Sequence, residues 1–175
     1  MEVKTFICYF GPYLRSLLLM KQPESLEMVA EFHRTFKHPI LPNPTIPDES
    51  RCRLRVELLA EELREFEVAI NQNDIVGVAD ALCDLQYVLS GAVLEFGLAG
   101  KFKALFDEVQ RSNMSKACQT EEEALETVQY YFKKDGTKCF YLREGKKWLV
   151  FREKDRKTMK SRGYSPADLQ SILAH

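Results

Sequence analysis

The chain has 175 residues, 45% of them hydrophobic, and its 25 basic side chains nearly balance 26 acidic ones. This length and composition exclude a large multi-domain protein and a disordered one, and they predict a globular chain of about one domain. Charge is unevenly distributed, because residues 133–162 hold 12 basic and 4 acidic side chains, a net +8 that leaves −9 for the rest. An acidic body with a basic C-terminal segment is the first indication of function.

The first twenty residues are an apolar stretch interrupted by Pro12 and Arg15. The stretch is too short and too broken for a membrane span, and it lacks the small-residue cleavage site of a signal peptide. We expect a poorly ordered extension over residues 1–20, with Met20 as an alternative start, and no membrane association. The five cysteines are scattered without a CxxC pair, which favours free thiols in the cytoplasm over a disulfide framework or a zinc site.

Hydrophobic periodicity predicts helices over most of the chain. Ser25 is expected to cap a first helix, whose apolar stripe carries Leu26, Val29, Ala30 and His33. Four prolines between residues 39 and 47 then require an extended connection. Two long helices follow at about 49–71 and 74–96, the second ended by Gly97 and Gly100, and a shorter one covers about 103–112.

The last third of the chain predicts a different structure. Thr120 and Glu123 form a capping box that opens a helix to about residue 132, and residues 139–142 and 148–151 are expected to form a β-hairpin. Ser165, before Pro166, is expected to cap a last short helix. The predicted fold is all-α, an antiparallel helical bundle over residues 21–118, with a small C-terminal β-hairpin in a segment, 119–175, that packs on it.

Three glutamates of the first long helix, Glu61, Glu62 and Glu65, lie between 0° and 100° on a helical wheel. The apolar stripe follows at 140–200° and consists of Leu59, Leu63, Phe66 and Ile70, while other charged residues occupy the opposite arc. The three glutamates therefore border the core. On this helix alone, an exposed acidic edge and a functional site explain the pattern equally well.

Asp80 and Asp84 are the charged residues of the next helix between residues 75 and 94, and they share one face with Gly77 and Gly91. A helix that is apolar nearly all round is expected to be buried, and a buried carboxylate is paired, protonated or metal-bound. Pairing with an arginine of the neighbouring helix is one explanation, from Arg53, Arg55 or Arg64. The other is an all-oxygen site for Mg²⁺ or Mn²⁺, formed by five carboxylates of the two helices without a histidine ligand.

This pattern resembles the all-α nucleoside triphosphate pyrophosphohydrolases, a superfamily that includes MazG, dimeric dUTPases and phosphoribosyl-ATP pyrophosphohydrolase. Glu62 and Glu65 match its ExxE motif, with Glu61 as the glutamate before it, and Asp84 matches the aspartate of its ExxD motif. Ala81 stands at the glutamate of ExxD, and Asp80 matches a subgroup that reads Ala-Asp-Ala-Leu-x-Asp. That subgroup, which is similar to phosphoribosyl-ATP pyrophosphohydrolase, also shows Phe-His (Phe32-His33 here) and Ser-Asn-x-Ser-Lys (112–116 here).

The resemblance implies magnesium-dependent hydrolysis of a nucleoside triphosphate between its α- and β-phosphates, with phosphoribosyl-ATP as an alternative substrate. It implies five metal ligands, Glu61, Glu62, Glu65, Asp80 and Asp84, and gives Glu61 the further task of orienting or deprotonating the attacking water. It also implies substrate contacts from His33, Tyr87, Arg111, Asn113, Lys116, Lys157 and Lys160. Structural roles compete for several of these: a satisfied buried histidine, a core tyrosine, and an ordinary helix C-terminus at 111–116.

Two rival classes remain open. A nucleic-acid-binding module would use the basic segment and its aromatic residues, but it leaves Asp80 and Asp84 unexplained. A non-enzymatic helical oligomer would use the same scaffold without chemistry. In either case we expect a homodimer or a pair of dimers, because the other helices cannot cover residues 75–94 on every side.

Overall fold

The structure is a computed structural model that describes residues 23–174, so the expectations for residues 1–20 lie outside the described part of the chain. It contains helices and one small antiparallel hairpin, which confirms the predicted fold class. The described residues form two compact units, 23–40 with 47–95 and 41–46 with 96–174. The division falls before the helix at 102–114, whereas we expected that helix in the same domain as the long ones.

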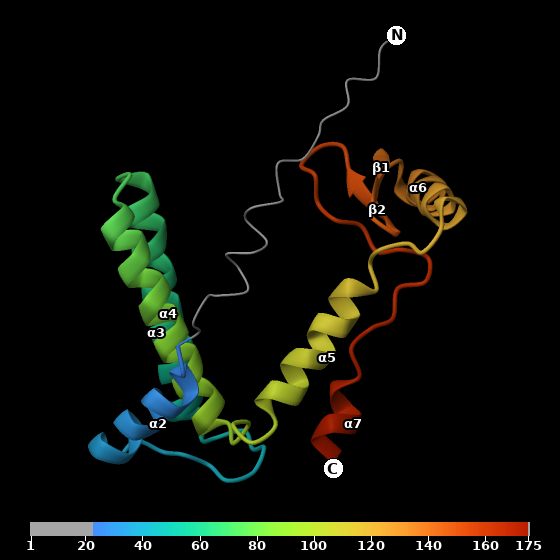
Figure 1. Ribbon diagram of the computed structural model, residues 1–175. Helices are drawn as coiled ribbons and strands as arrows, with labels where there is room; N and C mark the ends of the chain where they lie inside the picture. The colour runs from blue at the N-terminus through green and yellow to red at the C-terminus, as the bar shows by residue number, and fades with distance from the viewer. Residues whose placement is uncertain (1–22, 175) are drawn as a thin grey trace. The chain divides into compact units, whose positions relative to one another are not determined.

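The first unit consists of three helices, α2 (Ser25–Phe36), α3 (Glu49–Asn71) and α4 (Ile75–Glu95). Helices α3 and α4 run side by side in opposite directions, and α2 packs against α4 (Figure 1). The bounds of α3 are the predicted ones, and Asp48 caps it by accepting a hydrogen bond from the Arg51 N–H at 3.1 Å. This pair of long helices carries the predicted carboxylates.

The face that α3 turns toward α4 differs from the predicted apolar stripe. Its buried and half-buried residues include Arg55, Leu58, Leu59, Glu62, Phe66 and Ala69, which occupy about 60–160° on the wheel. Leu63 and Ile70 are instead 57% and 52% exposed, so the predicted stripe at 140–200° was partly wrong. The cause is the glycine face of α4: a Cβ at Gly77 would lie 3.1 Å from Ala69 Cβ, and one at Gly91 would lie 2.6 Å from Arg55 Nη1.

Helix α4 is covered over one half only. Its C-terminal half is buried around Ser90, Val93 and Leu94, but Asp80 and Asp84 are exposed in the single chain, which corrects the expectation that they are buried. Helices α2 and α3 are its packing partners, and they leave much of its N-terminal half uncovered. Among the helices of residues 23–174, α4 alone is long and apolar enough to cross a membrane by length and composition, a test that core helices of soluble proteins also pass.

The second unit contains α5 (Phe102–Met114), α6 (Glu121–Asp135), β1 (Cys139–Glu144), β2 (Lys147–Arg152) and α7 (Leu169–Ala174). Thr120 caps α6 by accepting from the Glu123 N–H, as predicted, and Gly136 ends it with a positive φ. The two strands pair antiparallel, and with α6 they enclose a small core of Cys118, Ala124, Cys139 and Val150. Tyr141 and Trp148 pack against that core.

Two predicted helix caps were wrong. Ser25 is the first residue of α2 rather than its N-cap, and its hydroxyl accepts from the Gln86 side chain at 3.3 Å. Ser165 does not cap α7, because that helix begins only at Leu169, and the main-chain N–H of Ser165 donates to the Ser115 hydroxyl at 2.9 Å. Asp168 takes the capping role and accepts from the Ser171 N–H at 3.1 Å. The four cysteines of the described residues are free thiols.

Candidate active site

Five carboxylates of α3 and α4, here called the carboxylate cluster, lie at the middle of the helix pair: Glu61, Glu62, Glu65, Asp80 and Asp84. Glu62 lies in the packed arc of α3 and is half-buried. Asp84 is seven residues from both Gly77 and Gly91, so it shares the face of α4 that meets α3. The two helices therefore bring these carboxylates together from separate parts of the sequence.

The charges of the cluster act on one another. Burial raises the pKa of Glu62, and the charges of the other four members, with Asp84 first, raise it further. Burial and like charges both destabilise the ionised form of such a carboxylate, and a bound cation would stabilise it. The cluster is therefore an electrostatically unfavourable arrangement in the protein alone, as expected of a site selected for something other than stability.

Arginine pairing does not neutralise the cluster. Arg53 bonds Glu49 at 2.6 Å, and Arg55 bonds the buried Glu95 at 2.5 Å. Across residues 23–174, none of the ion pairs includes a member of the carboxylate cluster. Pairing with an arginine of the neighbouring helix therefore does not explain Asp80 and Asp84 within the described residues.

An open hollow of about 450 Å³ adjoins the cluster on the α3–α4 surface. Glu61, Glu65 and Asp80 line it, together with Arg64 and Gly77. As the side chains stand within residues 23–174, no three histidine, cysteine, aspartate or glutamate residues converge closely enough to hold a metal ion. The two helices thus carry carboxylates on neighbouring turns, but the carboxylate oxygens do not converge on one point.

Two predicted substrate contacts lie further along the same unit. His33 is 2% exposed, and its ring nitrogens contact the Pro39 carbonyl at 2.8 Å and Arg55 Nη2 at 3.3 Å. Burial lowers the pKa of His33, so the ring is neutral, donates to Pro39 and accepts from Arg55. Both ring nitrogens are thus in use, as expected for the structural role that competes with a substrate contact at this residue. Tyr87 is 38% exposed and meets the Phe32 ring edge to face at 5.6 Å.

The second unit brings several predicted phosphate-binding residues together. Lys116 Nζ donates to Asn113 Oδ1 at 2.7 Å, and Lys160 Nζ lies 4.1 Å from the centre of the Tyr164 ring. A hydrogen bond from Ser112, and the nearby charges of Lys160 and Lys116, lower the pKa of Tyr164. Lys116 and Lys160 therefore flank one tyrosine hydroxyl. Lys157 is exposed, and its main-chain N–H donates to Asp155.

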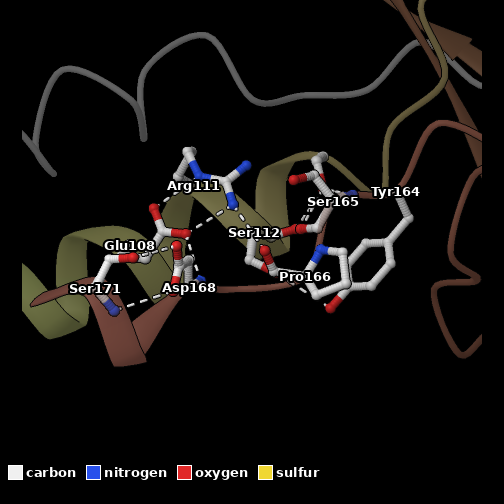
Figure 2. Close-up of polar contacts among 9 residues, drawn as sticks. Glu108, Arg111, Ser112, Tyr164, Ser165, Pro166, Asp168 and Ser171 are labelled. Atoms are coloured by element: carbon white, nitrogen blue, oxygen red, sulfur yellow. Dashed lines mark hydrogen bonds and ion pairs between the residues drawn. The ribbon is translucent and has the colours of Figure 1, made fainter. Parts of the chain in front are cut away.

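Arg111 is committed to the chain itself. Its Nε and Nη2 donate to Glu108 at 2.7 and 2.8 Å, and Nη2 also donates to the Pro166 carbonyl at 2.9 Å (Figure 2). This ion pair, with the Asp168 N–H, lowers the pKa of Glu108 to about 2. Arg111 thus ties the C-terminal segment to α5 through its Nε and Nη2 donors.

A buried ionic group was missed from the sequence. Glu95 is fully buried and accepts from Arg51 and Arg55, and His33 completes the group. Its sequence signal is an arginine inside the packed arc of α3 combined with a single acidic residue at the end of the apolar α4. Glu95 lies one residue beyond the interval 75–94, in which Asp80 and Asp84 are the charged residues.

Comparisons with known proteins match the part of the chain that holds the carboxylate cluster. The phosphoribosyl-ATP pyrophosphohydrolase family matches residues 29–113, which include α3, α4 and the whole carboxylate cluster. The uncharacterized protein L479 of Acanthamoeba polyphaga mimivirus is 22% identical, over 84% of this chain and 94% of the viral protein. The family consists of pyrophosphohydrolases, which act on phosphoric anhydride bonds. Residues 29–113 therefore match the phosphoribosyl-ATP pyrophosphohydrolase family, which is part of the all-α MazG-like superfamily.

Proposed function

We propose that the protein hydrolyses a nucleoside triphosphate between its α- and β-phosphates, releasing a nucleoside monophosphate and pyrophosphate. The observation that carries this proposal is the carboxylate cluster, whose five acidic groups lie on adjacent helices and have no arginine partner within residues 23–174. In the reaction, water adds to the α-phosphorus, the bond from this phosphorus to the bridging oxygen breaks, and pyrophosphate leaves with that oxygen. The triphosphate of phosphoribosyl-ATP offers the same bond and is the alternative substrate.

The donor set suits a hard divalent cation, Mg²⁺ or Mn²⁺, because every member offers carboxylate oxygens. All five members of the cluster would hold it: Glu61, Glu62, Glu65, Asp80 and Asp84. Their oxygens do not converge as they stand, but aspartate and glutamate side chains rotate freely enough to turn toward a shared ion. A bound cation would offset the charge of the triphosphate and polarise its phosphoryl oxygens.

The chain itself would position the water and the phosphates. Glu61 is exposed beside the hollow, where it could accept the proton of the attacking water. Lys116, with Asn113 bonded to it, and Lys160 are proposed to contact the phosphates, and Lys157 would add charge from the same basic segment. The family match covers residues 29–113 and so does not include Lys116, Lys157 or Lys160.

We also propose that the protein is a homodimer or a pair of dimers, and the exposed apolar residues support this. Val56, Leu63 and Ile70 on α3 are 66%, 57% and 52% exposed, and they repeat every seven residues. Ile75, Leu82 and Leu89 repeat in the same way on α4. Heptad stripes on an antiparallel helix pair are typical of a surface that packs against another helix pair. Light scattering should show that Leu63→Asn weakens the assembly, while Leu125→Asn on α6 leaves it unchanged.

The decisive experiment measures pyrophosphate release from a panel of nucleoside triphosphates and phosphoribosyl-ATP, with magnesium and with chelator. Asp84→Asn should lose nearly all turnover, while Glu67→Gln, on the solvent-facing side of the same helix pair, should retain it. Turnover that persists in chelator, or in Asp84→Asn, would exclude the proposed chemistry. No release from any substrate by a folded wild-type protein would instead favour the non-enzymatic oligomer.

The nucleic-acid alternative gains no support from the hairpin aromatics. Tyr141 and Trp148 pack against the core of the second unit, and Phe140 and Phe151 contact each other across the strands at 5.7 Å. Arg143 and Arg156 lie over the Trp148 and Phe140 rings. The rings are thus occupied by packing and by the protein's own cations, so they are poorly placed to stack on bases.

A further inference from the structure

A cavity of about 220 Å³ lies within the first unit, lined by none of the carboxylate cluster, and no step of the proposed hydrolysis uses it. All three helices contribute to it, with Phe32 from α2, Leu58 from α3 and Val88 from α4 among its lining residues. Its volume equals that of about seven water molecules. Such a space suits one planar ring system.

Aromatic rings form part of its wall. Phe32 stacks nearly parallel to His38 at 5.7 Å and meets Tyr87 edge to face at 5.6 Å, and all three residues line the cavity. Phe32 and Tyr87 are 37% and 38% exposed, so they are not consumed by the core. Rings held in place by one another, with accessible faces, are what a stacked heterocycle requires.

Arg55 supplies a polar group in this otherwise largely apolar space. Its side chain is 8% exposed, and its Nη2 is held by Glu95 and by His33. Among residues 23–174, Nη1 makes no hydrogen bond and Nε is buried without a partner. Nη1 lies beside Gly91, which also lines the cavity, at the point where a side chain would come within 2.6 Å of it. His33 and Gly91 are therefore positioning residues for Arg55.

The cavity lies one helical turn from the carboxylate cluster. Leu58 precedes Glu62 by four residues on α3, and Val88 follows Asp84 by four residues on α4. Four residues of helix span about 6 Å, so both helices place the cavity the same short distance from the acidic groups. When the phosphates of a nucleotide lie at the cluster, its base lies at about this distance from them.

We propose that this cavity binds the base of the substrate, with Phe32 and Tyr87 against its ring and Arg55 Nη1 donating to a carbonyl oxygen. The proposal rests on nucleotide hydrolysis as the function and specifies the class of base. A guanidinium can only donate, so it matches guanine, cytosine, uracil or thymine, which carry a carbonyl oxygen. Adenine carries an amino donor in place of that oxygen and should bind more weakly.

Nucleosides and ribose test the cavity without phosphate, metal or chemistry. Titration of the full chain, followed by NMR, should show that a carbonyl-bearing nucleoside binds about tenfold or more tightly than ribose, and more tightly than adenosine. Tyr87→Ala should weaken this binding about tenfold, as expected for one lost stacking contact. Tyr130→Ala, a tyrosine of equal 38% exposure on α6, is the matched control and should bind as wild type does.

Arg55→Lys retains a charge for Glu95 while it removes Nη1, and it should erase the preference over adenosine. If this variant does not fold, Phe32→Ala and Tyr87→Ala decide the question. Equal binding of ribose and all nucleosides, tightest binding of adenosine, or wild-type binding by Tyr87→Ala would overturn the proposal. Nucleoside binding without pyrophosphate release would leave the cavity in place and refute the hydrolysis, whereas hydrolysis without nucleoside selectivity would do the reverse.

Discussion

Replacing Glu62 by glutamine should stabilise the protein in the absence of divalent cations. Four like charges surround Glu62, and each partly exposed pair of this kind costs a few tenths of a kcal/mol after solvent screening. Their sum is about 1 kcal/mol, which corresponds to a rise in melting temperature of about 3 °C for a chain of this length. Thermal unfolding by circular dichroism at pH 7.5, in chelator, measures it.

The pH dependence gives the sign independently. Because the pKa of Glu62 is raised in the folded state, its protonated form favours folding, and that contribution is lost as pH rises from the ordinary glutamate pKa through the raised one. The advantage of Glu62→Gln should therefore shrink at pH 4 and reach its full size at pH 7.5. Added magnesium should stabilise wild type more than the variant. A melting temperature that falls at pH 7.5 would refute this reasoning and return Glu62 to a stabilising ion pair.

Two further substitutions test the buried and the exposed acidic groups. Glu95→Gln should cost about 3–5 kcal/mol, because it leaves Arg55 buried without its counter-charge, whereas Glu49→Gln at an exposed pair should change the melting temperature by about 1 °C or less. Burial opposes ionisation of Glu95, but its two arginine partners lower its pKa overall, so the stabilisation that it provides is lost as pH falls through that lowered value. If Asp80 replaces the carboxylate missing at Ala81, as we propose, Asp80→Ala should reduce turnover by about a hundredfold or more. A loss of tenfold or less, about 1.4 kcal/mol, would show that Asp80 is not a ligand.

Local signals in the sequence predicted the elements well where the chain's own chemistry decides them. The bounds of α3, the Thr120 cap and the hairpin follow from capping and alternation within a few residues. The cap at Ser25 failed because its hydroxyl accepts from the distant Gln86, and the cap at Ser165 failed because α7 begins only at Leu169. A serine before a helix predicts a cap only if no tertiary contact competes for it.

The carboxylate cluster could be predicted as a set, but not its burial. Spacing placed Asp80 and Asp84 on one face, and the structure brings that face to Glu62. The most apolar arc of the α3 wheel predicts the wrong contact face with α4. The small residues Gly77 and Gly91 let α3 approach α4 through a face that includes Glu62 and Arg55. The close approach of the helices at the two glycines therefore decides which face of α3 packs on α4, more than the apolar area of that face does.

Apolar residues that the packing of α3 on α4 leaves exposed lie next to the carboxylate cluster, and they connect the site to the proposed assembly. Leu63, left exposed by the actual packing, adjoins Glu62 in the sequence, and Leu82 is two residues from Asp84. A second copy seated on these stripes would shield the carboxylate cluster from water, which strengthens its attraction for a cation. Linkage requires the converse, so magnesium should tighten the dimer about tenfold, a common size for coupling between sites. Sedimentation with magnesium and with chelator measures this, using Glu67→Gln as control and Asp84→Asn as the variant in which the response should vanish. An equal dimer dissociation constant in both conditions would show that the cluster and the apolar stripes act independently.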